Sequence, residues 1–225
     1  FSRTVKYFLD RNSIEYADRH LDILMGDHIS DQYKAINPLQ KVPAIREGSF
    51  ILFESTTILK YLANSKEVDD HWYPKDSKKR GIVDLYLDWH LAHLDDLLLF
   101  SAVITGFKKM NLAEAKSKTD EAFAEIENIF LKDRKFLASD SKPTIADIVL
   151  VWHLAGIMDT GYEASSKISQ YLEDVYNEEP DLLEDIEYYL RHRQIALKGS
   201  KVLFPFTTYK DYCSCQTMDV KSLVY

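Results

Sequence analysis

The spacing of apolar residues changes about one third of the way along the chain. In the first third, Val5, Phe8 and Leu9 recur at i, i+3 and i+4, the period of one helix face, whereas residues 50–53 form the short apolar run of a strand. The pattern predicts helices over 2–9, 30–36 and 55–64, and strands over 16–23, 42–46 and 50–53. Ser30 is a candidate N-cap of the second helix, which Asn37-Pro38 ends. We therefore expect a mixed α/β domain in this part of the chain.

Beyond about residue 70, only the helical period continues. Apolar positions at 3.6-residue spacing run through 77–107, 111–138, 143–159, 164–176 and 179–198. Residues 72–76 precede the first of these stretches, and Pro74 stiffens them as a linker. We expect a second, all-α domain over 71–225, ending in an aromatic-rich tail from Lys201 that is packed but irregular.

Charge follows the same division of the chain. The 225 residues carry a net charge of −8, and residues 1–64 are neutral, with eight basic and eight acidic side chains. Phosphate backbones and anionic lipid surfaces select a basic face, so we expect neither nucleic acid nor a membrane as partner. The longest apolar run, 97–107, is interrupted and falls short of the about 18 residues that a membrane helix needs.

Two cysteines, Cys213 and Cys215, are separated by one residue near the C-terminal end of the sequence. This spacing is too short for an ordinary structural disulfide, which favours a reducing compartment, and we predict a cytoplasmic protein. Neither a helix start nor a basic neighbour accompanies the pair, so it is interpreted as inert rather than redox-active.

The segment 40–59 carries the most specific motif. Val42 and Pro43 open a strand, a turn at 47–49 leads to its partner strand, and Glu54-Ser55 begins a helix a dozen residues later. This order resembles the glutathione-binding half of a cytosolic glutathione transferase, most closely one of the theta class. Further points of resemblance are Gly26-Asp27-His28, Asp70-His71-Trp72-Tyr73-Pro74, Asp88-Trp89-His90 and Thr144-Ile145-Ala146-Asp147.

The resemblance implies a fold and an assembly. The fold is a thioredoxin-like α/β domain over 1–70 followed by an all-α domain over 71–225, with the first strand of the α/β domain upstream of Phe1. Glutathione is the implied co-substrate, and no metal is implied. The resemblance also implies a homodimer, with residues near the Ser55 helix and the first long helix forming the contact.

Each residue of the motif receives a role from the resemblance. If the Val42–Pro43 bond is cis, the chain bends and the backbone of Val42 faces solvent, where the cysteinyl unit of glutathione can pair as an added strand. His28 and Lys41 stand where theta enzymes hold the glycine carboxylate. Ile29 departs from the family pattern, because a basic residue often follows the histidine, and this change is expected to weaken glutathione affinity.

Ser55 is an N-cap candidate at the start of the predicted helix. A helix N-terminus attracts carboxylates through unpaired N–H groups and its dipole. By resemblance, Ser55 binds the γ-glutamyl carboxylate and Glu54 pairs with the α-ammonium group of glutathione. Taken without the resemblance, a plain capped helix explains these two residues, and an ordinary edge-strand proline explains Pro43.

The thiolate of glutathione needs a hydrogen-bond donor, because a free thiol of pKa about 8.5 is mostly protonated at neutral pH. In theta-like chains this donor is a serine that ends the first strand and is followed by two residues and a Ser-Arg pair. Ser2-Arg3 matches the later pair, so we expect the catalytic serine three positions before Ser2, upstream of Phe1. Ser2 itself is then a helix cap or a supporting donor.

His90 and His93 lie at i, i+3 on the first long helix, with Asp96 nearby. Such a spacing permits metal ligation, but a site needs further ligands, and histidines lining a domain interface explain the pair equally well. The same helix, through Tyr86, Trp89 and Leu97, is a candidate wall for an apolar electrophile pocket.

Thr144 and Asp147 have the spacing of a capping box before an apolar run, which indicates a role in folding rather than in catalysis.

The leading hypothesis is therefore conjugation of the glutathione thiolate to a small apolar electrophile. The alternative is a transferase-like fold kept as an interaction module, without turnover, in a larger assembly. Binding of glutathione without conjugation would distinguish the alternative from the leading hypothesis. A glutathione-dependent peroxidase or dehalogenase shares the binding site and differs only in the electrophile, so the sequence does not separate it.

Overall fold

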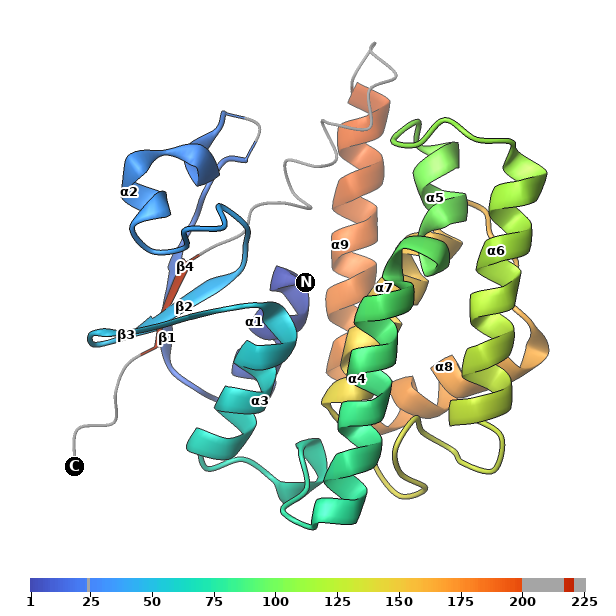
Figure 1. Ribbon diagram of the computed structural model, residues 1–225, viewed down its shortest axis with the longest axis horizontal. Helices are drawn as coiled ribbons and strands as arrows, with labels where there is room; N and C mark the ends of the chain where they lie inside the picture. The colour runs from blue at the N-terminus through green and yellow to red at the C-terminus, as the bar shows by residue number, and fades with distance from the viewer. Residues whose placement is uncertain (24, 200–216, 221–225) are drawn as a thin grey trace. The chain divides into compact units, whose positions relative to one another are not determined.

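The chain divides into two compact units, one mixed α/β and one helical (Figure 1). The computed structural model describes residues 1–23, 25–199 and 217–220. Unit 1 contains residues 1–68 and the described residues from Glu187 onward, and unit 2 contains Asp69–Ile186. The expected fold class is confirmed. The assignment of every residue beyond 70 to the helical domain stays a prediction.

Unit 1 is built on a sheet whose described strands have the order β1-β4-β2-β3. The strands are β1 (Tyr16–Arg19), β2 (Ala44–Glu47), β3 (Phe50–Phe53) and β4 (Thr217–Val220). β1 is antiparallel to β4, β4 is parallel to β2, and β2 is antiparallel to β3. The turn between β2 and β3 falls where the sequence predicts it, and Gly48 there has a φ of +60°, which glycine adopts without steric cost.

Strand β4 differs from the sequence-based expectation of an irregular tail. Most of that tail, including Cys213 and Cys215, lies outside the described residues, but Thr217–Val220 form a strand between β1 and β2. A four-residue segment carries almost no periodic signal of its own. It is ordered here because neighbours on both sides supply ladder partners that are more than 150 residues away in the chain.

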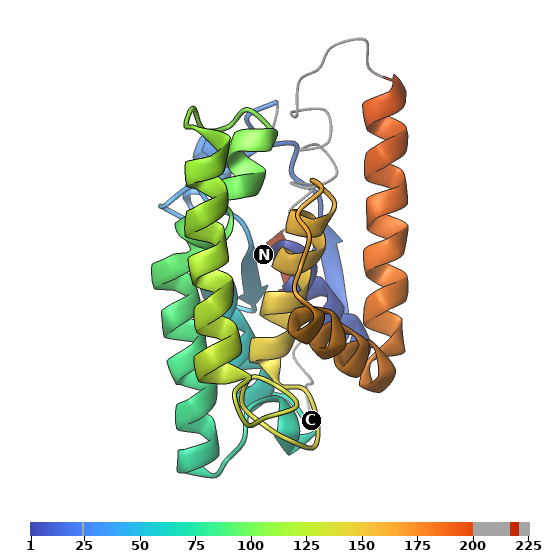
Figure 2. The same ribbon diagram turned by 90° about the vertical axis from the view of Figure 1, so that its right-hand side faces the viewer.

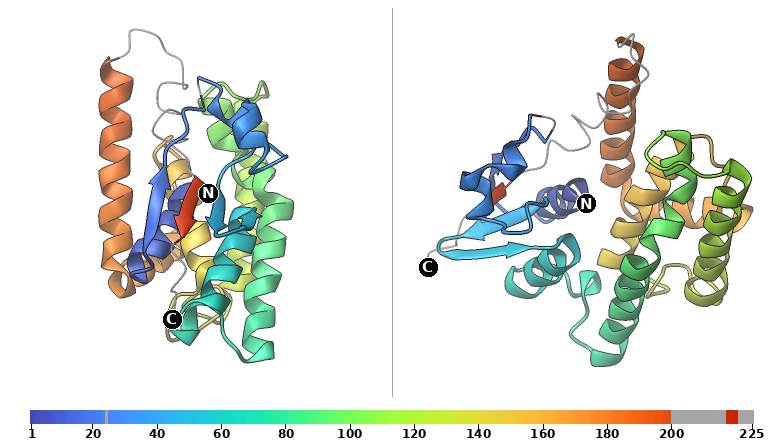
Figure 3. Two further views of the ribbon diagram at one scale, coloured as in Figure 1. Left: turned by 90° about the vertical axis from the view of Figure 1, so that its left-hand side faces the viewer. Right: turned by 45° about the horizontal axis from the view of Figure 1, so that its top comes forward.

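Helices α1 (Ser2–Arg11) and α3 (Ser55–Ser65) lie together against one face of this sheet (Figure 3). Both were expected from the apolar period, and their bounds agree with the prediction to within two residues. Val5, Phe8 and Leu9 of α1 and Ile58, Leu59 and Leu62 of α3 are fully buried. The short 3-10 helix η1 (Asp27–Ile29) precedes α2 (Asp31–Lys34), which ends before the predicted residue 36. Ser30 caps α2 as predicted, its Oγ accepting the Tyr33 N–H at 3.2 Å.

Unit 2 is a bundle of helices around α7 (Ile145–Met158). Every residue of α7 except Gly156 and Met158 is buried, so the helix is apolar on all sides and occupies the centre of the bundle. The other elements are η2 (Asp70–Trp72), α4 (Ser77–Leu97), α5 (Leu99–Ile104), α6 (Leu112–Glu125), the π-helical turn η3 (Ile126–Phe130), α8 (Ser166–Glu178) and α9 (Pro180–Gly199), which continues into unit 1. Helices α4 and α6 lie side by side (Figure 2). In the described part of the chain, no helix is both long and apolar enough to cross a membrane.

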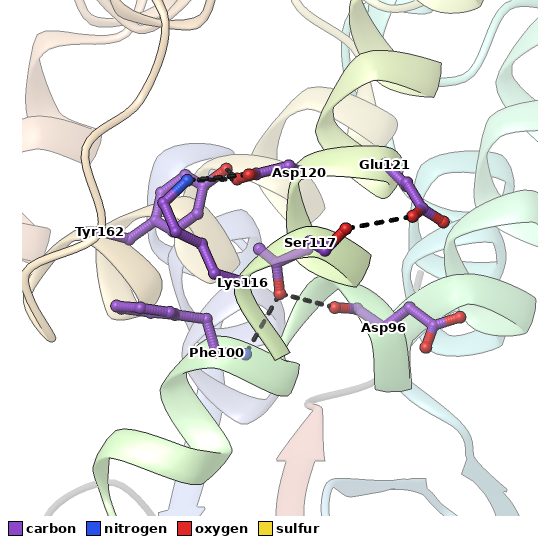
Figure 4. A network of polar contacts seen from close by, with 8 residues as sticks. Asp96, Phe100, Lys116, Ser117, Asp120, Glu121 and Tyr162 are labelled. Atoms are coloured by element: carbon purple, nitrogen blue, oxygen red, sulfur yellow. Dashed lines mark hydrogen bonds and ion pairs between the residues drawn. The ribbon is translucent and has the colours of Figure 1, made fainter. Parts of the chain in front are cut away.

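Thr119 of α6 joins the two helices into which the predicted stretch 77–107 divides, through hydrogen bonds to Asp96 of α4 and Phe100 of α5, both labelled in Figure 4. Its fully buried hydroxyl donates to the carbonyl of Asp96 at 2.9 Å and accepts the N–H of Phe100 at 3.1 Å. The hydroxyl thereby satisfies backbone groups on both sides of the break between α4 and α5. Nearby, Asp120 accepts hydrogen bonds from Lys116 and from the hydroxyl of Tyr162, which ties α6 to the segment after α7.

Asp147 is the best-connected buried carboxylate described in unit 2. It accepts the N–H groups of Leu137 (2.9 Å) and Thr144 (2.7 Å) and the hydroxyls of Thr144 (3.0 Å) and Tyr171 (3.0 Å). Thr144 in turn caps α7, so the predicted capping box is confirmed. Burial raises the pKa of Asp147, and these hydrogen bonds act against that rise.

His90 and His93 face different surroundings. His90 is fully buried, and its Nδ1 lies 3.1 Å from the hydroxyl of Tyr86, whereas the half-exposed ring of His93 stacks on Trp89. One ring therefore lies in the core of the bundle and the other at its surface. Among the residues that the structure describes, no group of three or more His, Cys, Asp or Glu residues is placed to hold a metal ion.

The ring of His90 lies 4.8 Å from that of His153, centre to centre, inside the helical core. The Nδ1–H of His153 donates to the carbonyl of Val149 at 2.8 Å. Burial lowers the pKa of His90 to about 4. The pKa of His153 is lowered well below its usual value by burial and by the proximity of His90. Both rings are therefore neutral in the folded protein at neutral pH.

Replacing Asp147 with alanine should lower the free energy of unfolding by about 3 kcal/mol, because the buried donors of Leu137, Thr144 and Tyr171 lose their acceptor. Urea denaturation followed by circular dichroism measures the loss. Asp76→Ala is the matched control: Asp76 caps α4 in an exposed position, so its donors can turn to water and the loss should be clearly smaller. Equal losses would contradict the role assigned to Asp147.

Stability should fall as the pH drops from about 6.5 to 4. In this window the unfolded chain protonates His90 and His153 and the folded chain does not, so stability declines by up to about 1.4 kcal/mol per pH unit for each ring. His90→Gln should flatten this decline, measured by urea unfolding at a series of pH values. His93→Gln, the same substitution at the half-exposed histidine of the same helix, is the matched control. Asp147 is present in both proteins, so the difference between them reports the loss of His90 together with its effect on the pKa of His153.

Candidate functional site

The register of the β2–β3 hairpin places the two halves of the sequence motif next to each other. Ala44, the first residue of β2, pairs with Phe53, the last residue of β3. Pro43 and Glu54 directly flank this pair, so Val42-Pro43 and Glu54-Ser55 meet at one end of the hairpin. The structure therefore brings together four of the residues expected to bind a ligand.

The Val42–Pro43 peptide bond is cis, as the resemblance implies. Pro43 is buried, and Val42 lies just outside the paired register of β2, which begins at Ala44. The backbone of Val42 is therefore not part of the ladder between β2 and β3. It is positioned where an extended peptide can add to the end of the sheet.

The loop before Val42 is held by the carbonyl of Lys41. This oxygen accepts the hydroxyl of Tyr33 at 2.7 Å and the side-chain amide of Asn37 at 2.6 Å, and both donors are almost fully buried. The side chain of Lys41 is exposed. The supporting roles of Tyr33 and Asn37 were not expected, because in the sequence Asn37 signals only the end of a helix before Pro38.

His28 lies in η1 and is linked to the same loop through its neighbour, since Gln40 donates its side-chain amide to the carbonyl of Ile29 at 3.2 Å. The Nδ1 of His28 is buried and has no hydrogen-bond partner among the described residues. A buried polar atom without a partner is costly unless a ligand or water satisfies it. His28 and Lys41 thus lie on segments joined by a hydrogen bond, at the start of β2.

Glu54, and not Ser55, is the N-cap of α3. Glu54 has φ +71° and ψ 112°, and its carbonyl accepts the N–H of Ile58 at 2.8 Å, so Ser55 is already the first helical residue. The predicted cap at Ser55 is wrong because a single residue makes the turn from β3 into α3, and only a left-handed φ allows so sharp a turn. This conformation costs a non-glycine residue about 1–2 kcal/mol.

The N-terminus of α3 lacks a side-chain cap within the described structure. No side chain of the N-cap residue accepts from the first turn, and that turn contains no acidic residue. Ser55 is largely buried and Glu54 is exposed. Unpaired N–H groups together with the helix dipole form an anion site, and the adjacent carboxylate suits an ammonium group.

Ser2 is the first residue of α1, and Phe1 is its N-cap, so the predicted capping role of Ser2 is wrong. Its Oγ is buried and has no hydrogen-bond partner among the described residues. The role of supporting donor stays a prediction, as does the catalytic serine expected upstream of Phe1.

The chain is similar to known proteins over both units. Residues 1–64 match the model of the glutathione S-transferase N-terminal domain, and residues 109–178 match that of the C-terminal domain. Glutathione S-transferase theta-2 of Mus musculus is 36% identical over 169 residues, which cover 72% of this chain and 69% of the mouse protein.

Solved structures show the same fold. The apo form of human glutathione S-transferase T1-1 superposes with a TM-score of 0.78 at 27% identity, covering 92% of this chain and 90% of the human one. Human glutathione transferase theta-2, in a complex with glutathione and an unknown ligand, superposes with a TM-score of 0.71 at 27% identity over 94% of each chain.

Because residue 54 has a left-handed φ, we expect glycine to give a more stable protein than alanine at this position, the reverse of their order inside a helix. Glu54→Gly should be more stable than Glu54→Ala by about 1 kcal/mol, because only glycine adopts the left-handed φ without steric cost. Thr57, exposed in the first turns of α3, is the matched control, and there alanine should be more stable than glycine by about 1 kcal/mol. Thermal and urea unfolding measure both pairs, and the same preference at both positions would contradict the strained turn.

Proposed function

The chain belongs to the glutathione S-transferase family, and on this basis we propose that it is a theta-like transferase that joins the thiolate of glutathione to a small apolar electrophile. One observation carries the proposal. The uncapped N-terminus of α3 and the cis Val42–Pro43 bond lie side by side at the end of the β2–β3 hairpin. A plain capped helix, the structural alternative for Glu54-Ser55, does not require this arrangement.

Glutathione lies along the end of the hairpin in this proposal. The cysteinyl unit pairs with the backbone of Val42 as a short added strand. The γ-glutamyl carboxylate binds Ser55 and the free N–H groups of α3, and the exposed carboxylate of Glu54 pairs with the α-ammonium group. Lys41 and His28 hold the glycine carboxylate at the other end, where the unpartnered Nδ1 of His28 finds a partner.

Catalysis then consists of stabilising a thiolate. A serine three positions before Ser2 donates a hydrogen bond to the sulfur, which favours S⁻ over SH at neutral pH. The thiolate attacks the electrophilic carbon, forms a thioether and displaces the leaving group with its electron pair. The thiol proton leaves to solvent, and no further reactant is needed.

The electrophile is held by the helical domain. Tyr86 and Leu97, which the sequence suggested as pocket walls, are fully buried in the bundle core, and Trp89 is tied to Glu125 by a 2.7 Å hydrogen bond. Apolar side chains are exposed instead around the connection between α5 and α6, at Ile104, Phe107 and Leu112. Their exposure supports an apolar co-substrate, because water-exposed groups of this kind commonly mark binding surfaces.

The proposal includes a homodimer with its contact near α3 and α4, and a cytoplasmic location. Membership of a family of theta-class enzymes supports both points.

Glutathione binding tests the site. In the full-length protein, Glu54→Gln and Lys41→Gln should each weaken binding by about tenfold in isothermal titration calorimetry, because each removes one charge-assisted contact. Lys34→Gln, an exposed lysine on α2 outside the motif, is the charge-matched control and should bind as the unmodified protein does. Unchanged affinity in both site variants would refute the assignment.

Turnover separates the enzyme from the interaction module. The full-length protein should convert an activated aryl halide and glutathione to the thioether, followed by absorbance, with the rate rising as the thiol ionises. Binding of glutathione without any conjugation, tested over several electrophile classes, would favour the module.

A further inference from the structure

Unit 2 contains a cavity of about 520 Å³ for which the proposed function has no use. One wall is the linker and the start of α4, with His71 and Lys79, and the other is the loop before α7, with Arg134, Ser139 and Ser141. Small-molecule sites commonly enclose about 300–1,000 Å³, so the cavity is large enough for a metabolite. All of its lining residues belong to unit 2.

The walls of the cavity are held by hydrogen bonds that cross it or close its loops. The Nδ1–H of His71 donates to the carbonyl of Pro143 at 2.7 Å and joins the two walls. The Nε–H of Arg80 donates to the carbonyl of Pro74 at 2.7 Å and fixes the linker against α4. On the other wall, Ser139 Oγ accepts the Ser141 N–H at 3.1 Å. The cavity is therefore preformed, which lowers the entropic cost of binding.

The two segments that supply Lys79 and Arg134 to the cavity are basic in an otherwise acidic chain, although Asp70 and Asp140 also line the cavity. Residues 75–80 contain four basic and one acidic side chain, and residues 132–142 contain four basic and two acidic ones, although the net charge of the whole chain is −8. The two segments thus carry net charges of +3 and +2, whereas the chain as a whole is negatively charged. Such local reversal of charge attracts small anions.

Two cations that line the cavity, Lys79 and Arg134, have no salt-bridge partner within the described part of the chain. Neither the ammonium of Lys79 nor the guanidinium of Arg134 makes a hydrogen bond or salt bridge with a described residue, whereas the neighbouring Lys135 lies within 3.8 Å of Asp174 and 3.5 Å of Glu178. Two carboxylates also line the cavity, and each accepts a hydrogen bond from a backbone N–H five residues away in the chain. Asp70 accepts the N–H of Lys75, and Asp140 accepts that of Lys135.

We propose that this cavity binds a small phosphorylated anion, with Arg134 and Lys79 as its principal ligands. The planar guanidinium suits two phosphate oxygens at once, and the ammonium acts as a point charge on a third. The hydroxyls of Ser139 and Ser141, 3.2 Å apart on the loop, supply further hydrogen bonds. The remaining volume accepts the organic part of a phosphate ester. This site is independent of the proposed glutathione site.

Titration with glycerol 3-phosphate and with inorganic phosphate tests the site, at constant ionic strength and with the full-length protein. Saturable binding is expected in calorimetry and in ³¹P NMR. Lys79→Gln combined with Arg134→Gln should weaken it by at least about tenfold, as expected for the loss of two charge-assisted contacts. If the ester binds more tightly than inorganic phosphate, the ligand of this site is an organic phosphate. If the two bind equally, the ligand is free phosphate.

Lys78→Gln combined with Lys132→Gln is the matched control, because it removes the same charge from neighbouring residues that do not line the cavity. This double variant should bind both probes as the unmodified protein does. An equal loss in the two double variants would mean diffuse attraction and overturn the site, as would the absence of saturation with both probes. Glutathione affinity, measured in the same variants, should not change, so failure of this site is distinct from failure of the proposed function.

Discussion

The antiparallel pairing of β2 with β3 is the constraint on which the candidate site depends. With Ala44 opposite Phe53, the residues on either side, Pro43 and Glu54, are forced together. A shift of the register by one residue would turn every side chain of the hairpin to the other face and separate the two halves of the motif. The left-handed φ of Glu54 follows from the same pairing, because α3 has to start immediately after the paired strand. The burial of Ile58, Leu59 and Leu62 offsets the strain energy of this backbone conformation at Glu54.

The helical unit depends on two buried polar side chains, Asp147 and Thr119, that each make several hydrogen bonds. Asp147 ties the start of α7 to the loop at Leu137 and to Tyr171 of α8, and Thr119 bridges the break between α4 and α5. Each polar atom fixes one relative position of elements that apolar packing alone would allow to slide. The cavity lined by Lys79 and Arg134 forms beside this framework, since Thr144, which lines the cavity, also belongs to the capping box of Asp147.

Much of the fold and part of the site were predictable from local signals. The helix periods, the turn around Gly48, the cap at Ser30 and the capping box at 144–147 involve residues close in sequence, and the structure confirms them. The N-cap at Ser55 was mispredicted because a serine before an apolar helix looks the same whether it is the cap or the first helical residue. The buried partners of Lys41, the isolation of His90 from His93 and strand β4 depend on contacts that no local pattern encodes.

The sequence by itself determined the two fold classes and most element positions, because periodicity, caps and turns follow from interactions within a few residues. The motif at 40–59 was identified by its resemblance to a family and not by these local interactions. Tertiary structure alone decided which of these residues meet. It set the hairpin register, placed a strand from the far end of the chain between β1 and β2, and enclosed two cations from segments 55 residues apart in one cavity. These outcomes depend on long-range pairing and burial, whose energies arise only when distant segments are packed together.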